Sequence, residues 1–418
     1  MYLRISKQSK NVIYMQVFLV CVMLWLKTVL NFPAAITYTT DLFLLYALVK
    51  CFGKFQTNIT SARAGIVCLI MGLLLMASVI GLVYNQSSVL LYIWGIRNNG
   101  RFFLFFLCCI VLLEKIDIDK IFKMLRCLFW INLFLMMFQY LVQGLEGDYV
   151  GGLFGVEQGC NAYVNIFLCV VCAHQIARYL TNRISLPNLL CYVFCAFFAA
   201  AISELKVFYV EFVIMLVVAI IANRPTLKTI GILIISLIGI GIGVYFLNQY
   251  NPDSLEIFTD SEVRETYLEG EGYTGSGDLN RFTSIATLGK LFLNKNPVQA
   301  LFGLGIGSCD TSSISFLQSS FFERYGYLHY RWFSHAWIYL EQGMVGLSLY
   351  IAFFVTIFIW MATKRMKGRN DLWLLTLAFL PTCLVGMVYN NALQMETSYL
   401  IAFTCAIPFV LVKENYTI

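Results

Sequence analysis

Long apolar runs recur along the whole chain. Each is long enough, or nearly so, to cross about 30 Å of hydrocarbon as an α-helix. The run at 34–50 is the weakest, because Asp41 interrupts it. The pattern predicts an all-α integral membrane protein with about twelve transmembrane helices. We expect these spans at residues 12–30, 34–50, 64–83, 98–113, 124–143, 161–178, 187–203, 206–222, 229–248, 335–361, 372–389 and 397–412.

Composition supports the same class of protein. Apolar residues make up 60% of the chain, and charged residues only 12%, about half the roughly 25% of a soluble domain. So few charges cannot cover a water-soluble surface. The composition therefore excludes a soluble enzyme, a disordered chain and a nucleic-acid binder.

The basic residues predict an orientation, because Lys and Arg gather in cytoplasmic loops. With the N-terminus inside, most of the 29 Lys and Arg residues fall in cytoplasmic segments. The loop 144–160 and the segment 250–334 carry more acids than bases and face outward. Both termini are then cytoplasmic.

The segment 250–334 is too long for a structureless connection without a function. Within it, Phe282, Ile285, Leu288 and Phe292 recur at helical spacing. Asn280 is a plausible N-cap, and Asn294 to Pro297 form a stop. We expect a short amphipathic helix on the outer membrane surface. The chain then divides into transmembrane helices 1–9 at residues 1–249, one large extracytoplasmic loop at 250–334, and transmembrane helices 10–12 at 335–418.

A series of motifs in the second half of the chain leads to a resemblance. Arg281 opens the amphipathic helix, and Gly303-Leu304-Gly305-Ile306-Gly307 follows it. Next come Ser334-His335-Ala336-Trp337 and a run from Tyr339 to Leu347 that contains Glu341. In this order, the motifs resemble bacterial O-antigen and capsular polysaccharide polymerases of the Wzy type, and the related O-antigen ligases.

Two further motifs fit the same resemblance. Asp148 to Gly155, with Asn161 after it, is similar to an outer-face motif of these polymerases, as is Ser203-Glu204-Leu205-Lys206. The resemblance covers most of the chain, including the large loop before the third-last span. Order and topology carry it more than any single motif.

The resemblance implies an inverting, metal-independent glycosyl transfer at the outer face of the bacterial plasma membrane, without a cofactor. Donor and acceptor would be undecaprenyl-diphosphate-linked oligosaccharides. The surrounding partners would be membrane lipids, a chain-length regulator and a flippase, and no nucleic acid. No clustered Asp and Glu set of the kind that Mg²⁺ requires stands out in the sequence.

Three residues are the catalytic candidates. Arg281 suits the leaving diphosphate, because a guanidinium binds phosphate bidentately and a helix N-terminus attracts anions. His335 suits the acceptor hydroxyl, because its ordinary pKa near 6.5 fits a base at neutral pH. It can also be an amphipathic residue at the interface. Glu341 lies within a span, where a carboxylate needs a partner, so it serves as a proton acceptor or in a structural ion pair.

Other candidates have plain structural readings beside the functional one. Arg97 and Arg101, at the outer end of a span, can bind the diphosphate or extend to lipid headgroups. Lys206 can contact the diphosphate and Glu204 the substrate, or the two can pair with each other. Gly303, Gly305 and Gly307 permit a substrate loop with close backbone approach. Gly343 and Gly346 fit helix packing better than catalysis. Arg264, Arg324 and Arg331 can bind acidic sugar or phosphate, but they fit ordinary surface charge better.

Two other functions compete with the polymerase. An O-antigen ligase, which transfers glycan to lipid A-core, shares the chemistry and differs in its acceptor. A lipid-linked oligosaccharide flippase or other transporter can also have twelve spans, but transporters usually contain two repeated halves. The large loop has no counterpart in the first half of this chain, which favours the enzyme.

Overall fold

The structure is a computed structural model that describes residues 7–223, 272–274, 277–312, 314–364 and 370–415, with isolated positions between 231 and 265. In these ranges every regular element is a helix, and one isolated bridge joins Tyr273 to Leu279. The predicted ninth span, 229–248, and most of the acidic stretch from 251 to 271, including Arg264, lie outside the described residues.

Eleven of the predicted spans fall in the described ranges, and each coincides with helix. The prediction of an α-helical membrane protein is confirmed, since nine of the described helices are long and apolar enough to cross a membrane. The total number of spans stays a prediction. The helices are α1 (Lys7–Thr28), η1 (Ala34–Tyr38) with α2 (Thr39–Cys51), α4 (Gly65–Tyr84), α5 (Val89–Leu112), α6 (Lys115–Leu141), α7 (Asn161–Leu180), α8 (Leu186–Ile202), α9 (Lys206–Asn223), α16 (Ser334–Thr363), α17 (Asn370–Tyr389) and α18 (Ser398–Asn415).

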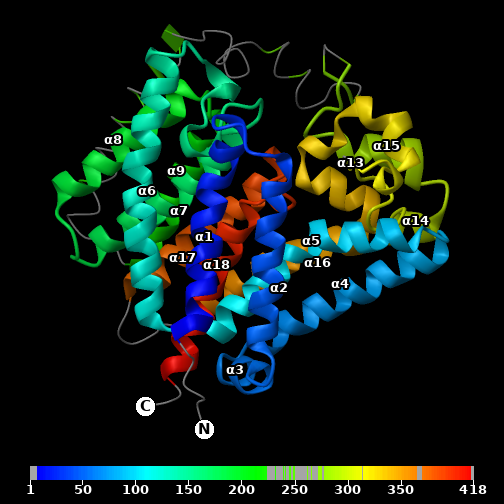
Figure 1. Ribbon diagram of the computed structural model, residues 1–418, viewed down its shortest axis with the longest axis horizontal. Helices are drawn as coiled ribbons and strands as arrows, with labels where there is room; N and C mark the ends of the chain where they lie inside the picture. The colour runs from blue at the N-terminus through cyan, green and yellow to red at the C-terminus, as the bar shows by residue number, and fades with distance from the viewer. Residues whose placement is uncertain are drawn as a thin grey trace.

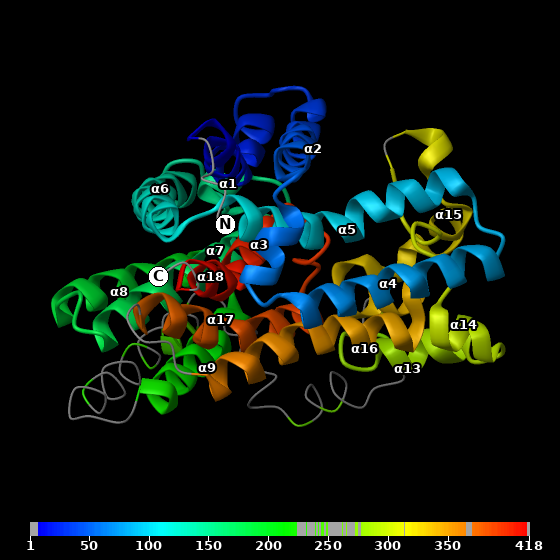
Figure 2. The same ribbon diagram turned by 90° about the horizontal axis from the view of Figure 1, so that it is seen from below.

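The helices form two groups of different inclination. α1, α2 and α6 stand roughly parallel, whereas α4 and α5 run obliquely beside them (Figure 1). Seen from below, α4, α5 and α16 extend together to one side, with α14 (Pro297–Phe302) and α15 (Ser320–Tyr325) at their far ends (Figure 2). α18 packs along α5, and α17 packs between α16, α7 and α9.

Buried aromatic rings fix the contact of α5 with α16 and α18. Phe102 and Phe106 of α5 each lie edge-on to Phe353 of α16, with ring centroids 5.4 and 5.2 Å apart. Phe106 also meets Phe409 of α18 at 5.5 Å. Apolar burial gives no net attraction between helices inside lipid, so such close, shaped contacts supply much of the association energy.

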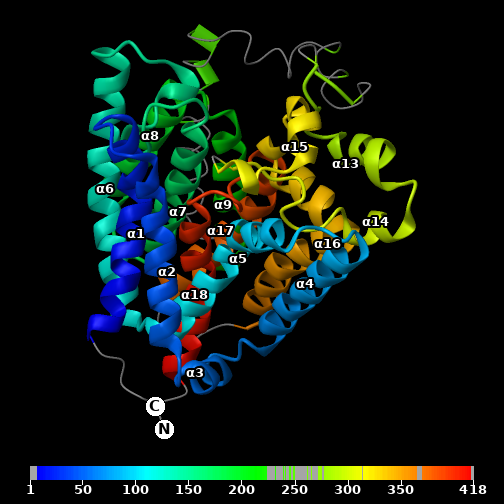
Figure 3. The ribbon, with the colours of Figure 1, turned by 45° about the vertical axis from the view of Figure 1, so that its right-hand side comes forward.

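Charged side chains tie the loops together at one end of the bundle. The start of α1 and the end of α18 lie at that end (Figure 3). Lys10 pairs with Glu114 at 2.5 Å, and Arg183 pairs with Asp371 at 3.3 Å. The buried Lys413 donates to the carbonyls of Ile110 and Leu113, so a cation caps the C-terminus of α5. At the other end, Lys27 pairs with Glu157 at 3.0 Å.

These contacts place the loops predicted to be cytoplasmic at one end of the bundle. The loop 144–160, predicted to face outward, lies at the other end, as does the segment that follows residue 277. Which end meets the cytoplasm stays a prediction from the distribution of Lys and Arg.

Three boundaries differ from the prediction. α5 begins at Val89 rather than near residue 98, so Arg97 and Arg101 lie well inside a helix and not at its outer end. The short helix after Arg281 begins only at Ser284, with Thr283 as its N-cap. It comprises α13 (Ser284–Leu288) and one wider turn, η5 (Gly289–Leu293). α16 is broken at Gly343, whose φ is 62° and ψ −165°.

Cysteine labelling tests the orientation with two exposed lysines at opposite ends. Lys295 precedes α14, and Lys364 follows α16. In intact cells, a membrane-impermeant maleimide should label Lys295→Cys and leave Lys364→Cys unlabelled until the cells are lysed. The exposed native Cys127 and Cys191 are first replaced by serine. The reverse pattern would place the loop in the cytoplasm and remove the basis for an outer site.

Candidate functional site

The polar segment Arg97-Asn98-Asn99-Gly100-Arg101 of α5 lies at the centre of the candidate site. Each of its four polar side chains meets a carboxylate from a different part of the chain. Arg97 donates to Asp41 of α2 from Nε at 2.9 Å and from Nη2 at 2.7 Å. Its guanidinium also stacks over Trp94, 4.7 Å from the ring centroid. Asp41, which weakens the second predicted span, is therefore the partner of Arg97.

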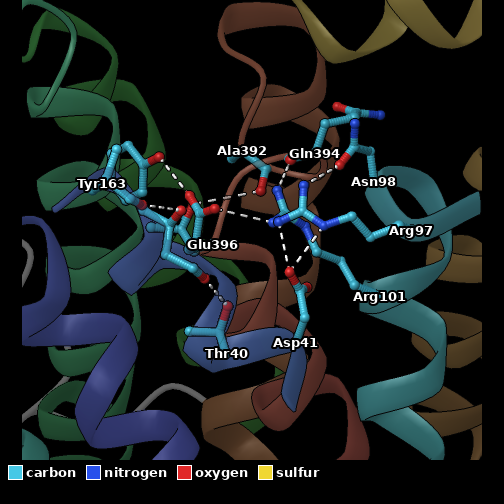
Figure 4. A network of polar contacts seen from close by, with 12 residues as sticks. Thr40, Asp41, Arg97, Asn98, Arg101, Tyr163, Ala392, Gln394 and Glu396 are labelled. Carbon is cyan, nitrogen blue, oxygen red and sulfur yellow. Dashed lines mark hydrogen bonds and ion pairs between the residues drawn. The ribbon is translucent and has the colours of Figure 1, made fainter. Parts of the chain in front are cut away.

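Arg101, also on α5, is buried and forms an ion pair with Glu396. Its Nη1 lies 3.1 Å from Glu396 Oε1, and its Nη2 donates to the Gln394 carbonyl. The Tyr163 hydroxyl donates to the other Glu396 oxygen at 2.8 Å (Figure 4). Burial opposes ionisation of Glu396, but the Arg101 charge and the Tyr163 hydrogen bond outweigh it and hold the pKa of that carboxyl below its usual value.

Asn98 joins α5 to the loop that follows the glycines. Its amide donates to Oδ2 of Asp310, which is fully buried, and Arg331 Nη2 lies 2.9 Å from Asp310 Oδ1. Burial raises the pKa of the Asp310 carboxyl, against the opposing effects of Arg331 and Asn98. The interpretation of Arg331 as ordinary surface charge is therefore wrong, because this arginine neutralises a buried acid.

Asn99 holds Glu341, one of the three catalytic candidates. Its Nδ2 donates to Glu341 Oε2 at 3.2 Å, and the Cys309 main-chain N–H donates to Oε1 at 3.2 Å. Glu341 is 1% exposed. Both oxygens thus bind the protein itself, and the geometry favours the structural reading of this glutamate over proton transfer.

The glycine-rich loop lies directly against this carboxylate. Gly303, Gly305 and Gly307 all have positive φ, at 72°, 97° and 81°. A Cβ at Gly303 would overlap the backbone of Glu341, and one at Gly307 would overlap the Leu91 carbonyl of α5. The glycines let the loop pass between α5 and α16, and this packing accounts for them without a substrate.

The break in α16 is completed by the same loop. The interruption at Gly343 frees main-chain carbonyls inside the membrane, where an unpaired one is costly. Leu304 N–H donates to Leu340 O at 2.8 Å, and Gly305 N–H donates to Glu341 O at 3.0 Å. Gly343 is thus a break in the helix rather than a simple packing glycine. Gly346 lies in the continuing helix, close to Gln342.

Arg281 differs from every arginine of the α5 network. It lies in the turn before α13, partly exposed. Its guanidinium carbon is 4.0 Å from the ring centroid of Tyr389 and 5.0 Å from that of Phe333. Its Nε is buried without a hydrogen-bond partner, and none of the described carboxylates forms an ion pair with it. Two aromatic rings therefore hold this cation, and its charge stays available to an anion.

His335 holds the turn that carries Arg281. Its Nε2 lies 3.0 Å from the Arg281 carbonyl and 2.8 Å from Ser284 Oγ, and its Nδ1 lies 3.2 Å from the Met387 carbonyl. The side chain is 4% exposed. The structure brings His335 and Arg281 together. It joins them through the main chain, and both ring nitrogens face protein atoms rather than solvent.

A hydrogen-bonded path connects this turn to α5. Ser334, beside His335, donates from its hydroxyl to Gln394 Oε1 at 2.7 Å and from its main chain to the Asn390 carbonyl at 2.8 Å. Gln394 in turn accepts from Arg101 through its main-chain carbonyl. The start of α16 and the connection between α17 and α18 are thereby held against one another.

The remaining candidates gather at the N-terminal ends of α7 and α9. Asn161 Nδ2 donates to Asp148 Oδ1 at 2.5 Å and to the Ser203 carbonyl at 3.1 Å. Glu204 has a φ of 52°, and its carboxylate packs against the Cα of Gly147. Its main-chain carbonyl accepts from the N–H of Lys206, the first residue of α9. The two outer-face motifs of the sequence thus form one cluster.

Tyr389, the last residue of α17, stacks under the Arg281 guanidinium. α17 also packs against α7 and α9, the two helices that begin at this cluster. The sequence reasoning missed Tyr389, Asp310 and Glu396. A signal for Glu396 was present, since an acid so close to a span needs a cation, and Arg101 lacked an assigned partner.

In the part of the chain that the structure describes, no three His, Cys, Asp or Glu side chains gather in a way that suits a metal ion. The metal-free reaction stays a prediction. No family model matches the sequence, and no curated protein matches it. The function is therefore inferred from the site itself.

Replacing Gly303 tests the contact between the glycine loop and α16. Gly303→Ala should destabilise the protein by about 1–2 kcal/mol for the left-handed backbone and by about 1–3 kcal/mol more for the overlap with Glu341. Gly53→Ala is the matched control, because Gly53 has a φ of 78° and nothing within 4 Å. Thermal unfolding in detergent compares them. Equal losses in the two variants would show that the loop is not packed as described.

The Arg101 and Glu396 ion pair predicts a pH dependence of stability. Because the pKa of Glu396 is lower in the folded protein, its contribution is present at neutral pH and disappears as the pH falls through that value. Glu396→Gln should cost about 3–5 kcal/mol at pH 7, by leaving Arg101 buried without its partner. The difference from wild type should shrink in acid.

Unfolding followed from pH 7 to pH 3 measures this. Glu157→Gln is the control, because Glu157 pairs with Lys27 where its side chain is 56% exposed, and such pairs contribute about 0–1 kcal/mol. A loss that is the same at every pH would contradict the linkage.

Proposed function

We propose that the chain is a polytopic glycosyltransferase that polymerises undecaprenyl-diphosphate-linked repeat units at the outer face of the bacterial plasma membrane. The observation that carries the proposal is the state of Arg281. It is the one arginine among the predicted donor-binding residues that meets no carboxylate in the described ranges. It also lies at the end of the bundle that the distribution of Lys and Arg places outside.

Arg97 and Arg101 differ from Arg281 in their partners, and this difference supports the assignment of Arg281 to the donor. Each of them forms an ion pair with a carboxylate, Asp41 and Glu396 respectively. A diphosphate could bind either one only by displacing that partner and leaving a carboxylate behind in a poorly hydrated place. These two arginines therefore build the frame, and Arg281 is assigned to the donor.

The chemistry of the donor explains why such a cation is needed. When the anomeric carbon is attacked, its bond to the diphosphate oxygen breaks and negative charge grows on the leaving group. A guanidinium already in place stabilises that charge, and its planar fork fits two phosphate oxygens. The rings of Phe333 and Tyr389 limit its movement, which reduces the entropy lost on binding.

His335 acts as a positioning residue in this proposal. Through its contacts with the Arg281 carbonyl and Ser284, it fixes the turn before α13, and through Met387 it fixes that turn to α17. The sequence suggested that His335 is a base or orients the acceptor. Its burial against the main chain supports a role in orientation, directed at Arg281.

The O-antigen ligase is the alternative within the same class. Its donor is also a glycan on undecaprenyl diphosphate, so the same arginine would serve it. The two enzymes differ in the acceptor, which is a second lipid-linked repeat for the polymerase and lipid A-core for the ligase.

Arg281 variants test the proposal in purified protein reconstituted in nanodiscs with a synthetic lipid-linked repeat unit. Arg281→Ala should slow elongation most, and Arg281→Lys should still impair it severely, because a lysine keeps the charge and loses the fork. Losing a preplaced charge contact of this kind costs roughly 10²–10³-fold in rate. Arg324→Ala, which removes an exposed charge from α15, should elongate like wild type.

The outcome that counts against the assignment is wild-type elongation by Arg281→Ala. If wild type itself elongates nothing and transfers glycan only to added lipid A-core, the ligase is the correct function.

A further inference from the structure

The acceptor half of the proposed reaction needs a group that takes a proton. Neither predicted base is placed for this. His335 and Glu341 are 4% and 1% exposed, and their nitrogen and oxygen atoms all face protein partners. A base must reach the hydroxyl of a large, water-borne sugar, so the group has to open on solvent beside Arg281.

Tyr389 connects the surroundings of Arg281 with two helices that carry or hold acids. Its ring lies 4.0 Å from the Arg281 guanidinium carbon. It is the last residue of α17, which packs against α16 and also against α7 and α9. Glu211 belongs to α9, and Asp148 is bound to Asn161, the first residue of α7. Glu211 lies inside α9 and is 0% exposed, with Asn165 and Cys169 donating to its Oε2. A sugar hydroxyl cannot reach it. Asp148 is exposed at the outer end of α7.

The surroundings of Asp148 hold its carboxylate in one orientation. Asn161 Nδ2 donates to Oδ1 at 2.5 Å and ties the same amide to the Ser203 carbonyl at 3.1 Å. The Cys160 thiol donates to the Asp148 main-chain carbonyl at 3.2 Å. Burial raises the pKa of Cys160 to about 12, so this thiol keeps its proton and stays a donor. Among the described residues, no hydrogen bond or ion pair engages Oδ2, the oxygen left for a substrate proton.

We propose that Asp148 is the base for the acceptor hydroxyl, oriented by Asn161, opposite Arg281 across Tyr389. The inference deepens the proposed transferase function and rests on it. It divides the outer site in two, with the donor diphosphate on the α13 side and the acceptor sugar on the side of α7 and α9.

Glycosyl transfer needs no group beyond Asp148, Arg281 and the two substrates. The acceptor oxygen forms its bond to the anomeric carbon of the donor while its proton moves to Asp148. On the opposite face of that carbon, the bond to the diphosphate oxygen breaks. The electron pair leaves with undecaprenyl diphosphate, whose charge Arg281 stabilises. The anomeric configuration is inverted.

Azide separates a missing base from a damaged donor site. It is an anion of low basicity that attacks the anomeric carbon without giving up a proton, so it needs no base. Asp148→Ala should lose elongation by roughly 10²–10⁴-fold. With azide, it should release undecaprenyl diphosphate and form a glycosyl azide of inverted configuration. Arg281→Ala should lose both reactions, because the leaving group is unsupported in each.

Glu146→Gln is the matched control, an exposed acid two residues from Asp148, and it should elongate normally. Asp148→Ala that elongates like wild type, or that is folded and forms no glycosyl azide, would overturn the inference and leave the transferase function standing. A wild-type protein that neither elongates nor releases undecaprenyl diphosphate would contradict the proposed function, and the inference with it.

Discussion

The cost of placing charge inside a membrane is the constraint on which this structure depends. A buried charge without a partner costs several kcal/mol, so each one must be matched. α5 does this with one polar segment, in which Arg97, Asn98, Asn99 and Arg101 each meet a carboxylate from a distant part of the chain. Because the four acids come from α2, the glycine loop, α16 and the connection before α18, satisfying this one helix fixes the relative positions of the others. The break in α16 obeys the same rule for main-chain groups, since the glycine loop supplies the hydrogen bonds that the helix has lost.

The charge of Arg281 is significant because the charges of the α5 segment are neutralised by acids. Arg97, Arg101 and Arg331 are each paired with an acid, whereas Arg281 is held by aromatic rings and by its main-chain carbonyl, which contacts His335. The frame reaches it through Arg101, Gln394 and Ser334, so the position of its charge is coupled to the ion pairs of α5. A departing diphosphate requires a rigid guanidinium that no acid neutralises. Asp148, on the other side of Tyr389, completes the proposed site, in which Arg281 stabilises the leaving group and Asp148 accepts the proton.

The sequence predicted the elements of this fold better than their contacts. Apolar runs located every helix in the described ranges that was expected to span, because length and hydropathy are local properties. The start of α5 was missed, since Trp94, Arg97 and Asn98 read as an interfacial segment until their partners are known. Asp41 was interpreted as an interruption of a span, because the sequence does not identify its partner, Arg97. His335 was a candidate base from its residue type and position, but its role depends on which atoms face it. That information lies in residues more than fifty positions away in the chain, Arg281 and Met387, and no local pattern contains it.

The central claim is that the protein joins repeat units while they are still attached to the lipid carrier. Gel analysis of the surface glycan and of the carrier-linked intermediates, in a strain lacking this chain, tests it most directly. The account predicts that a single repeat unit reaches the final acceptor, because export and attachment remain intact without polymerisation. Long glycan chains accumulating on undecaprenyl diphosphate would contradict it, since they would show that polymerisation continues and that transfer to the final acceptor is the step that was lost.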